Sequence, residues 1–191
     1  KVPIPTAGGL GVVFATTFGV LFYGFSEIDG RQAQEFYWII LATLIVAAGG
    51  LLDDFGKAKS FKAKIGFQIF GTIIVLFSGV SFGQIYIPFW GVSDLSFFGY
   101  LLTFFWIIGF TNVFNFMDGI DGIAGGTVLI TSTFLALLGI LLGIMELVYF
   151  SAILGFATAG FLFFNFPKAY IFMGDFGSQF LGFLLAIIGV L

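Results

Sequence analysis

The sequence contains no cysteine and no histidine among its 191 residues, and only 9% of them are charged. Without cysteine there is neither a disulfide framework nor a thiolate metal site, and without histidine the usual neutral-pH base and nitrogen ligand are missing. Any chemistry must therefore use carboxylates, amides and lysine, with or without a metal ion. Apolar residues are abundant instead: 60% of the chain is hydrophobic, with 30 Phe, 28 Gly and a mean hydropathy of +1.15.

Apolar runs of membrane-spanning length divide the chain. A hydrocarbon core roughly 30 Å thick needs about 20 apolar residues in a helix, and lipid offers no partner to free backbone polar groups. We therefore predict an all-α polytopic membrane bundle, with residues 1–191 forming a single domain. Seven spans are expected, at 8–25, 36–52, 65–83, 97–116, 122–142, 147–164 and 176–191. Because the sequence begins at Lys1 and stops within an apolar run, we expect a fragment that is incomplete at both ends.

Charged residues separate to the two ends of these spans. If each span crosses once, all basic residues except Arg31 fall on one side, which the positive-inside rule makes cytoplasmic. Five of the ten acidic residues share that side, namely Asp53, Asp54, Asp118, Asp121 and Asp175. Three connectors far apart in the sequence thus place aspartate and lysine on one membrane face. This convergence predicts a site for a hard cation and for phosphate groups.

Each aspartate-bearing connector also has a structural explanation. Asp53 and Asp54 end a span, where the helix dipole disfavours carboxylates, so the alternative for them is a solvated turn neutralised by nearby lysines. Asp121 and Asp175 each precede a span and could cap its N-terminus instead. Capping explains only one residue of the segment "NVFNFMDGIDGIAGG", which also contains Asn112, Asn115 and Asp118. These three are spaced by three residues, share one helix face and offer oxygen ligands that suit Mg²⁺.

Four segments in order resemble the motifs of the polyprenyl-phosphate N-acetylhexosamine-1-phosphate transferase family. They are "PTAGG", "DDFGKAK" with the later "AKIGFQ", "NVFNFMDGIDGIAGG", and "NFPKAYIFMGDFGSQFLGF", and they run from Pro5 to Gly182. The resemblance implies a multi-pass enzyme of the bacterial inner (plasma) membrane with a cytoplasmic active site. Such an enzyme transfers a sugar 1-phosphate from a UDP-sugar to undecaprenyl phosphate and releases UMP, as the first membrane step of cell-envelope glycan synthesis.

The resemblance also implies roles for individual residues. Metal binding, of Mg²⁺ or alternatively Mn²⁺, falls to Asn115 and Asp175. The catalytic residues implied are Asp53, Asp54, Asp118 and Asp121, the first two lying where the lipid phosphate enters. The substrate-binding residues implied are Asn112, Asn165, Lys57 and Lys64. The expected partners are a UDP-sugar, polyprenyl phosphate, the lipid bilayer and a second copy of the chain, since dimers occur in the family; no nucleic acid is expected.

The motifs divide between two branches of the family. Thr6 in "PIPTAGG" resembles the phospho-N-acetylmuramoyl-pentapeptide transferases, whereas "FNFMDGIDGIAGG" and "GSQFLGF" resemble the glycan-initiating branch, which we favour with GlcNAc as the sugar. The family pattern also includes a His-containing cytoplasmic loop that these residues do not contain, so we expect the site to be incomplete here.

The sequence lacks features that two other classes of membrane protein require. The CDP-alcohol phosphotransferases need an Ala-Arg pair after Asp-Gly, and none follows Asp118. A cation transporter would have ionisable residues deep within the spans, whereas the acidic residues here lie at span ends or in connectors.

A lipid phosphate is largely dianionic at pH 7, since its second pKa is about 6. We therefore favour its direct attack on the β-phosphate, with Asp53 orienting or deprotonating it, over a two-step route through an aspartyl phosphate.

Overall fold

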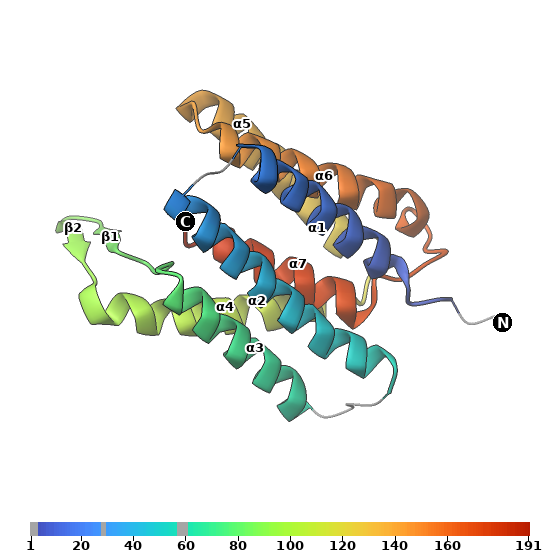
Figure 1. The fold of residues 1–191 in the computed structure, drawn as a ribbon. Helices are drawn as coiled ribbons and strands as arrows, with labels where there is room; N and C mark the ends of the chain where they lie inside the picture. Colours follow the sequence, from blue (N-terminus) through green and yellow to red (C-terminus); the bar gives the residue numbers. More distant parts are fainter. Residues whose placement is uncertain (1–3, 28–29, 57–60) are drawn as a thin grey trace.

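The computed structural model describes residues 4–27, 30–56 and 61–191, which form a helical bundle with one short hairpin (Figure 1). The helices are α1 (Gly8–Glu27), α2 (Gly30–Asp54), α3 (Phe61–Phe77), α4 (Ser96–Met117), α5 (Ile123–Leu142), α6 (Met145–Asn165) and α7 (Gly174–Ile188). Of these, α1, α2, α4, α5 and α6 are long and apolar enough to cross a membrane, whereas α3 and α7 have 17 and 15 residues. The predicted polytopic membrane bundle of about seven helices is confirmed.

One predicted span is wrong at both of its ends. The run at 65–83 was expected to be a single span, but α3 begins at Phe61 and ends at Phe77. Gly79 follows with a φ of 101°, a left-handed conformation that stops the helix. The chain then forms strands β1 (Gln84–Ile87) and β2 (Gly91–Asp94), which pair antiparallel at the end of the bundle opposite the N-terminus (Figure 1). An average of hydropathy over a window does not register such a break.

Helix α7 occupies the centre of the bundle. It lies between α1, α2 and α4 and packs against all three (Figure 1). Its residues are buried without interruption from Gly177 to Ile187. By contrast, α5 and α6 pair with each other at one side, and α6 joins them to α1. The shortest helix is thus the one that the others surround, and its first turn becomes the meeting point of several helix ends.

Glycines allow α7 to approach its neighbours closely. A Cβ atom placed on Gly9 of α1 would lie 2.6 Å from the Cα atom of Gly177, and one placed on Gly50 of α2 would lie 2.3 Å from the carbonyl oxygen of Asp175. The first turn of α1 is also bonded to the residue before α7, since the amide of Gly9 donates to the carbonyl of Met173 at 2.8 Å. Small residues at these contacts thus allow close helix packing.

Large aromatic side chains cover the outside of the bundle. Phe14, Phe18, Phe22 and Phe25 follow one another at helical spacing along α1, and each is at least 69% exposed. Such a stripe would be unfavourable in water but is ordinary on a surface that faces lipid tails. The high phenylalanine content thus belongs mainly to a surface suited to lipid.

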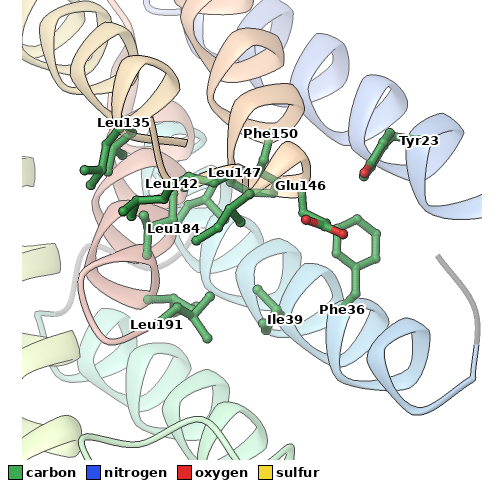
Figure 2. Close-up of a pocket in the computed structure, with 14 residues that line it drawn as sticks. Tyr23, Phe36, Ile39, Leu135, Leu142, Glu146, Leu147, Phe150, Leu184 and Leu191 are labelled. Carbon is green, nitrogen blue, oxygen red and sulfur yellow. The ribbon is translucent and has the colours of Figure 1, made fainter. Parts of the chain in front are cut away.

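An apolar cavity of about 450 Å³ lies at the helix ends remote from the aspartates (Figure 2). Tyr23 from the end of α1, Phe36 from the start of α2, and Leu184 and Leu191 from the end of the chain contribute to its lining. Glu146 is the one charged residue among the lining side chains. The aspartates of the predicted site occupy the opposite helix ends, so this cavity is not part of the site described below. These aspartates are Asp53, Asp54, Asp118, Asp121 and Asp175.

Candidate active site

Four helix ends bring an ion-paired cluster together around Asp175. The ammonium group of Lys64 in α3 contacts the carboxylates of both Asp175 and Asp53, and its Nζ lies 2.7 Å from Oδ2 of Asp53. Asn115 of α4 donates from Nδ2 to Oδ1 of Asp175 at 2.9 Å. The side chains of Asp53, Lys64 and Asp175 are 20%, 18% and 26% exposed. We call Asp53, Lys64, Asn115 and Asp175 the acid cluster; it is sheltered but still open to a ligand.

Asp54 caps α7 from a different helix. Its Oδ1 accepts the backbone N–H of Asp175 at 3.0 Å, and its Oδ2 accepts that of Phe176 at 2.9 Å. A carboxylate is unfavourable at the C-terminus of its own helix but favourable at the N-terminus of another, where free N–H groups and the positive end of the dipole meet it. The alternative that Asp175 caps α7 is therefore wrong: Asp175 lies in the first turn and points to Lys64 and Asn115.

Asp121 and Asn165 join the loop between α4 and α5 to the loop between α6 and α7. The side chain of Asn165 accepts the N–H of Gly122 at 2.7 Å and donates to the carbonyl of Ile171 at 2.9 Å. Asp121 accepts the N–H of Ala169 at 3.1 Å. The alternative that Asp121 caps α5 is wrong, because Gly122 with a φ of 76° occupies that position without a side-chain cap. The catalytic and substrate-binding roles of Asp121 and Asn165 stay predictions.

Asp118 follows the last residue of α4 and carries the most perturbed carboxyl group of the site. Burial raises the pKa of Asp118 from 3.8 to about 7, and the negative charges of Asp175 and Asp54 raise it further in the same direction. Among the described residues no cation offsets these effects on Asp118, so a carboxylate in this position would gain from a nearby metal ion or substrate hydroxyl.

We expect Asp118→Asn to stabilise the metal-free protein, and to do so increasingly with pH. The pKa of Asp118 is higher in the folded protein than in the unfolded one, so ionisation of Asp118 lowers the free energy of unfolding of the wild type. This loss of stability is absent below about pH 4, grows up to pH 7 and is complete above pH 7. Thermal unfolding in detergent with EDTA should therefore show a gap between variant and wild type that widens from pH 5 to pH 8. A gap that stays constant or narrows with pH would contradict this assignment of the pKa.

A second set of polar side chains lies one turn below the acid cluster. Asn112, predicted to bind substrate, donates instead to Oε1 of Gln68 at 2.7 Å and to the carbonyl of Ile108 at 2.8 Å. Gln68 in turn donates to Oε1 of Gln179 at 2.7 Å. The sequence motifs alone predict no role for these two glutamines, although a glutamine within an apolar run is itself a signal. The role of Asn112 in substrate binding stays a prediction.

The oxygen atoms at this site suit a hard divalent cation. Asp175, Asn115 and the uncompensated Asp118 offer carboxylate and amide oxygens, the ligands that Mg²⁺ prefers. Within the described ranges no group of three or more acidic, His or Cys side chains is arranged to hold a metal by itself. The ammonium of Lys64 lies between two of the carboxylates. Lys57, predicted to bind substrate, belongs to residues 57–60 and so lies outside the described residues.

Comparison with known proteins agrees with the family that the motifs resemble. The profile described as glycosyl transferase family 4 matches residues 36–191. The chain belongs to this family. Residues of all four helix ends in the acid cluster fall within the matched range, and the "PTAGG" segment precedes it.

Two members of the family are similar to this chain along its length. A probable undecaprenyl-phosphate N-acetylglucosaminyl 1-phosphate transferase of Bacillus subtilis (strain 168) is 33% identical over 189 residues, which cover 98% of this chain and 51% of that protein. A phospho-N-acetylmuramoyl-pentapeptide-transferase of Staphylococcus aureus (strain JH9) is 32% identical over 209 residues, which cover 100% of this chain and 63% of that protein. The chain thus spans about half to two thirds of the length of these curated relatives.

Proposed function

We propose that the protein transfers GlcNAc 1-phosphate from UDP-GlcNAc to undecaprenyl phosphate and releases UMP, at the cytoplasmic face of a bacterial plasma membrane. The observation that carries this proposal is the acid cluster itself, in which Asp53, Lys64, Asn115 and Asp175 come from four helix ends at one end of a membrane bundle. The relative from Bacillus subtilis is named for this reaction. The lysines that accompany the site in the sequence support the cytoplasmic side.

The charge balance of the site supports a role for a metal ion. Four carboxylates lie at this site, those of Asp53, Asp54, Asp118 and Asp175, and in the described part of the chain their ion pairs come from one ammonium, that of Lys64, while both substrates carry further negative charge. Anionic phosphates would be repelled from such a site unless cations accompany them. We assign Mg²⁺ to Asn115 and Asp175, with Mn²⁺ as a substitute; when bound, it would neutralise phosphate charge, including that of the leaving UMP.

In the proposed reaction, an oxygen of the lipid phosphate forms a bond to the β-phosphorus of the UDP-sugar. The bond between that phosphorus and the bridging oxygen breaks, and UMP leaves with the electron pair. Asp53 shares Lys64 with Asp175, so an arriving phosphate can take one of the two contacts of the ammonium. We assign two roles to Asp53: it orients the lipid phosphate, and it accepts any proton that this phosphate still carries. Asp54 holds the first turn of α7 with both oxygens, which suits a positioning role better than proton transfer.

The donor nucleotide-sugar is assigned to the loops joined by Asn165 and Asp121. These loops lie beside Asp118, whose partly buried carboxyl is available to a hydroxyl or amide of the donor. Thr6, the residue that distinguishes the two branches, lies close to the start of α7: its carbonyl oxygen is 2.6 Å from the position that a Cβ atom on Gly174 would take. Transfer of phospho-N-acetylmuramoyl-pentapeptide is therefore the second candidate function, and the relative from Staphylococcus aureus is named for it.

A transfer assay with the intact protein in detergent tests this proposal. With undecaprenyl phosphate, radiolabelled UDP-GlcNAc and Mg²⁺, we expect label to move into the lipid fraction and UMP to form in equal amount. EDTA should abolish the transfer, and Mg²⁺ or Mn²⁺ added in excess should restore it. Turnover of UDP-MurNAc-pentapeptide alone would assign the protein to the other branch. Silence with both donors would overturn the transferase proposal.

A further inference from the structure

Each of three residues in the acid cluster has an amide side chain one helical turn deeper on the same helix. Lys64 is followed by Gln68 in α3, Asp175 by Gln179 in α7, and Asn115 is preceded by Asn112 in α4. Because residues three or four apart lie on the same face of a helix, these amides lie directly beneath the acid cluster. We call Gln68, Asn112 and Gln179 the amide layer. Gln68 and Gln179 are 0% and 1% exposed.

The hydrogen bonds of the amide layer connect three helices. The carbonyl oxygen of Ile108 can only accept, so it fixes Asn112 with Nδ2 as the donor. Asn112 then donates to Gln68 of α3, and Gln68 donates to Gln179 of α7, both at 2.7 Å. Gln68 also donates back from Nε2 to Oδ1 of Asn112, at 3.4 Å. At the end of this series of hydrogen bonds, Nε2 of Gln179 is buried and has no partner among the residues that the structure describes.

Stability alone does not account for the amide layer. A buried donor without a partner costs about 1–3 kcal/mol, while hydrogen bonds between membrane helices contribute on average only about 0.6 kcal/mol. Thr72 and Thr111 avoid this cost locally, since each donates to the carbonyl four residues earlier in its own helix, whereas the hydroxyls of Thr16, Ser151 and Thr158 are buried without a partner among the described residues. Apolar residues at the positions of Gln68 and Gln179 would bury themselves without any such penalty.

The amides instead provide directional contacts between helices. A hydrogen bond constrains both distance and angle, so it fixes the rotation and the axial offset of two helices, which apolar packing between smooth side chains does less strictly. We propose that the amide layer is a positioning layer: Gln68, Asn112 and Gln179 set α3, α4 and α7 in the register at which Lys64, Asn115 and Asp175 meet. Its effect on transfer rests on the proposed function, but its effect on helix register does not.

The first test is kinetic and uses Gln68→Met and Gln179→Met in the intact protein. We expect kcat for transfer to fall about tenfold to a hundredfold, because a shift of about 1 Å at a reacting centre costs up to that much. The KM for UDP-GlcNAc and the unfolding temperature should change little. Gln179→Glu should keep most of kcat, since its carbonyl oxygen still accepts from Gln68. The matched control is Thr111→Val, a buried substitution next to Asn112 that removes no bond between helices.

The second test measures register without activity. The chain contains no cysteine, so spin labels can be placed on the exposed Phe61 of α3 and Phe116 of α4 through Phe→Cys substitutions, with any cysteine elsewhere in the protein replaced. The distance distribution between the labels should shift or broaden in Gln68→Met and stay narrow in Thr111→Val. An unchanged distribution together with an unchanged kcat would overturn the positioning role. If the wild type transfers no sugar phosphate, the proposed function fails, and the label distances still decide this inference.

Discussion

Asp175→Asn is expected to lower the rate of sugar-phosphate transfer by about 10³-fold or more, the largest effect of any substitution considered. The two oxygens of Asp175 accept from two donors, Lys64 on one side and Asn115 on the other. An asparagine offers one oxygen and one NH₂ group, so one of the two donors would face another donor. The negative charge that pairs with Lys64 and is assigned to Mg²⁺ would be lost as well.

The measurement is the initial rate of label transfer at saturating Mg²⁺, with unfolding temperatures recorded for each variant. Asp94→Asn is the matched control, because Asp94 lies in the hairpin at the opposite end of the bundle, where its side chain accepts from the amide and hydroxyl of Ser96. It should retain full activity. If folded Asp175→Asn keeps more than about a tenth of the wild-type rate, Asp175 is not essential to transfer.

The second large effect is expected from Gly50→Ala, although Gly50 carries no chemistry. The added Cβ would lie 2.3 Å from the carbonyl oxygen and 2.6 Å from the carbonyl carbon of Asp175, so α2 and α7 must move apart. Overpacking of this kind costs about 1–3 kcal/mol. The same movement displaces Asp175 from Asp54 and Lys64, and we expect transfer to fall about a hundredfold.

Gly66→Ala is the matched control for that variant. Gly66 lies in α3 two residues after Lys64, and nothing lies within 4 Å of a Cβ placed there. Alanine is favoured over glycine within a helix by about 1 kcal/mol, so this variant should unfold at a slightly higher temperature and keep its activity. The two substitutions should therefore move the unfolding temperature in opposite directions. A Gly50→Ala protein with wild-type activity would show that close contact of α2 with α7 is not needed.

The sequence predicts the membrane helices and the face where the aspartates gather, because both follow from composition along the chain. Which groups pair with one another was not predictable in the same way. Asp54 bonds to N–H groups 121 and 122 residues away, and only the packing of α2 against α7 brings them together. The hairpin after α3 was missed because its cause is local, a positive φ at Gly79, while hydropathy was averaged over a whole span.

For the site residues too, placement on a helix was predictable from the sequence, whereas bonding partners were not. The spacing of Asn112 and Asn115 correctly predicts one helix face, but it does not reveal that they belong to two depths, one bonded to Gln68 and the other to Asp175. The capping alternative for Asp121 followed from its place before a span and failed because its neighbour Gly122 takes the cap position. Local signals were therefore reliable for helices and faces. They were unreliable for partners, which depend on the arrangement of the whole bundle.

The central place of α7 determines when the site can first exist during synthesis. The ribosome releases α1 to α6 before the helix that carries Asp175, yet α7 packs between α1, α2 and α4. Until α7 enters, Asp54 has no helix to cap and Lys64 has one carboxylate instead of two. Lipid must then leave the space between the earlier helices as the last one arrives. A nascent chain that ends before Asp175 therefore contains the earlier helices but not an assembled acid cluster.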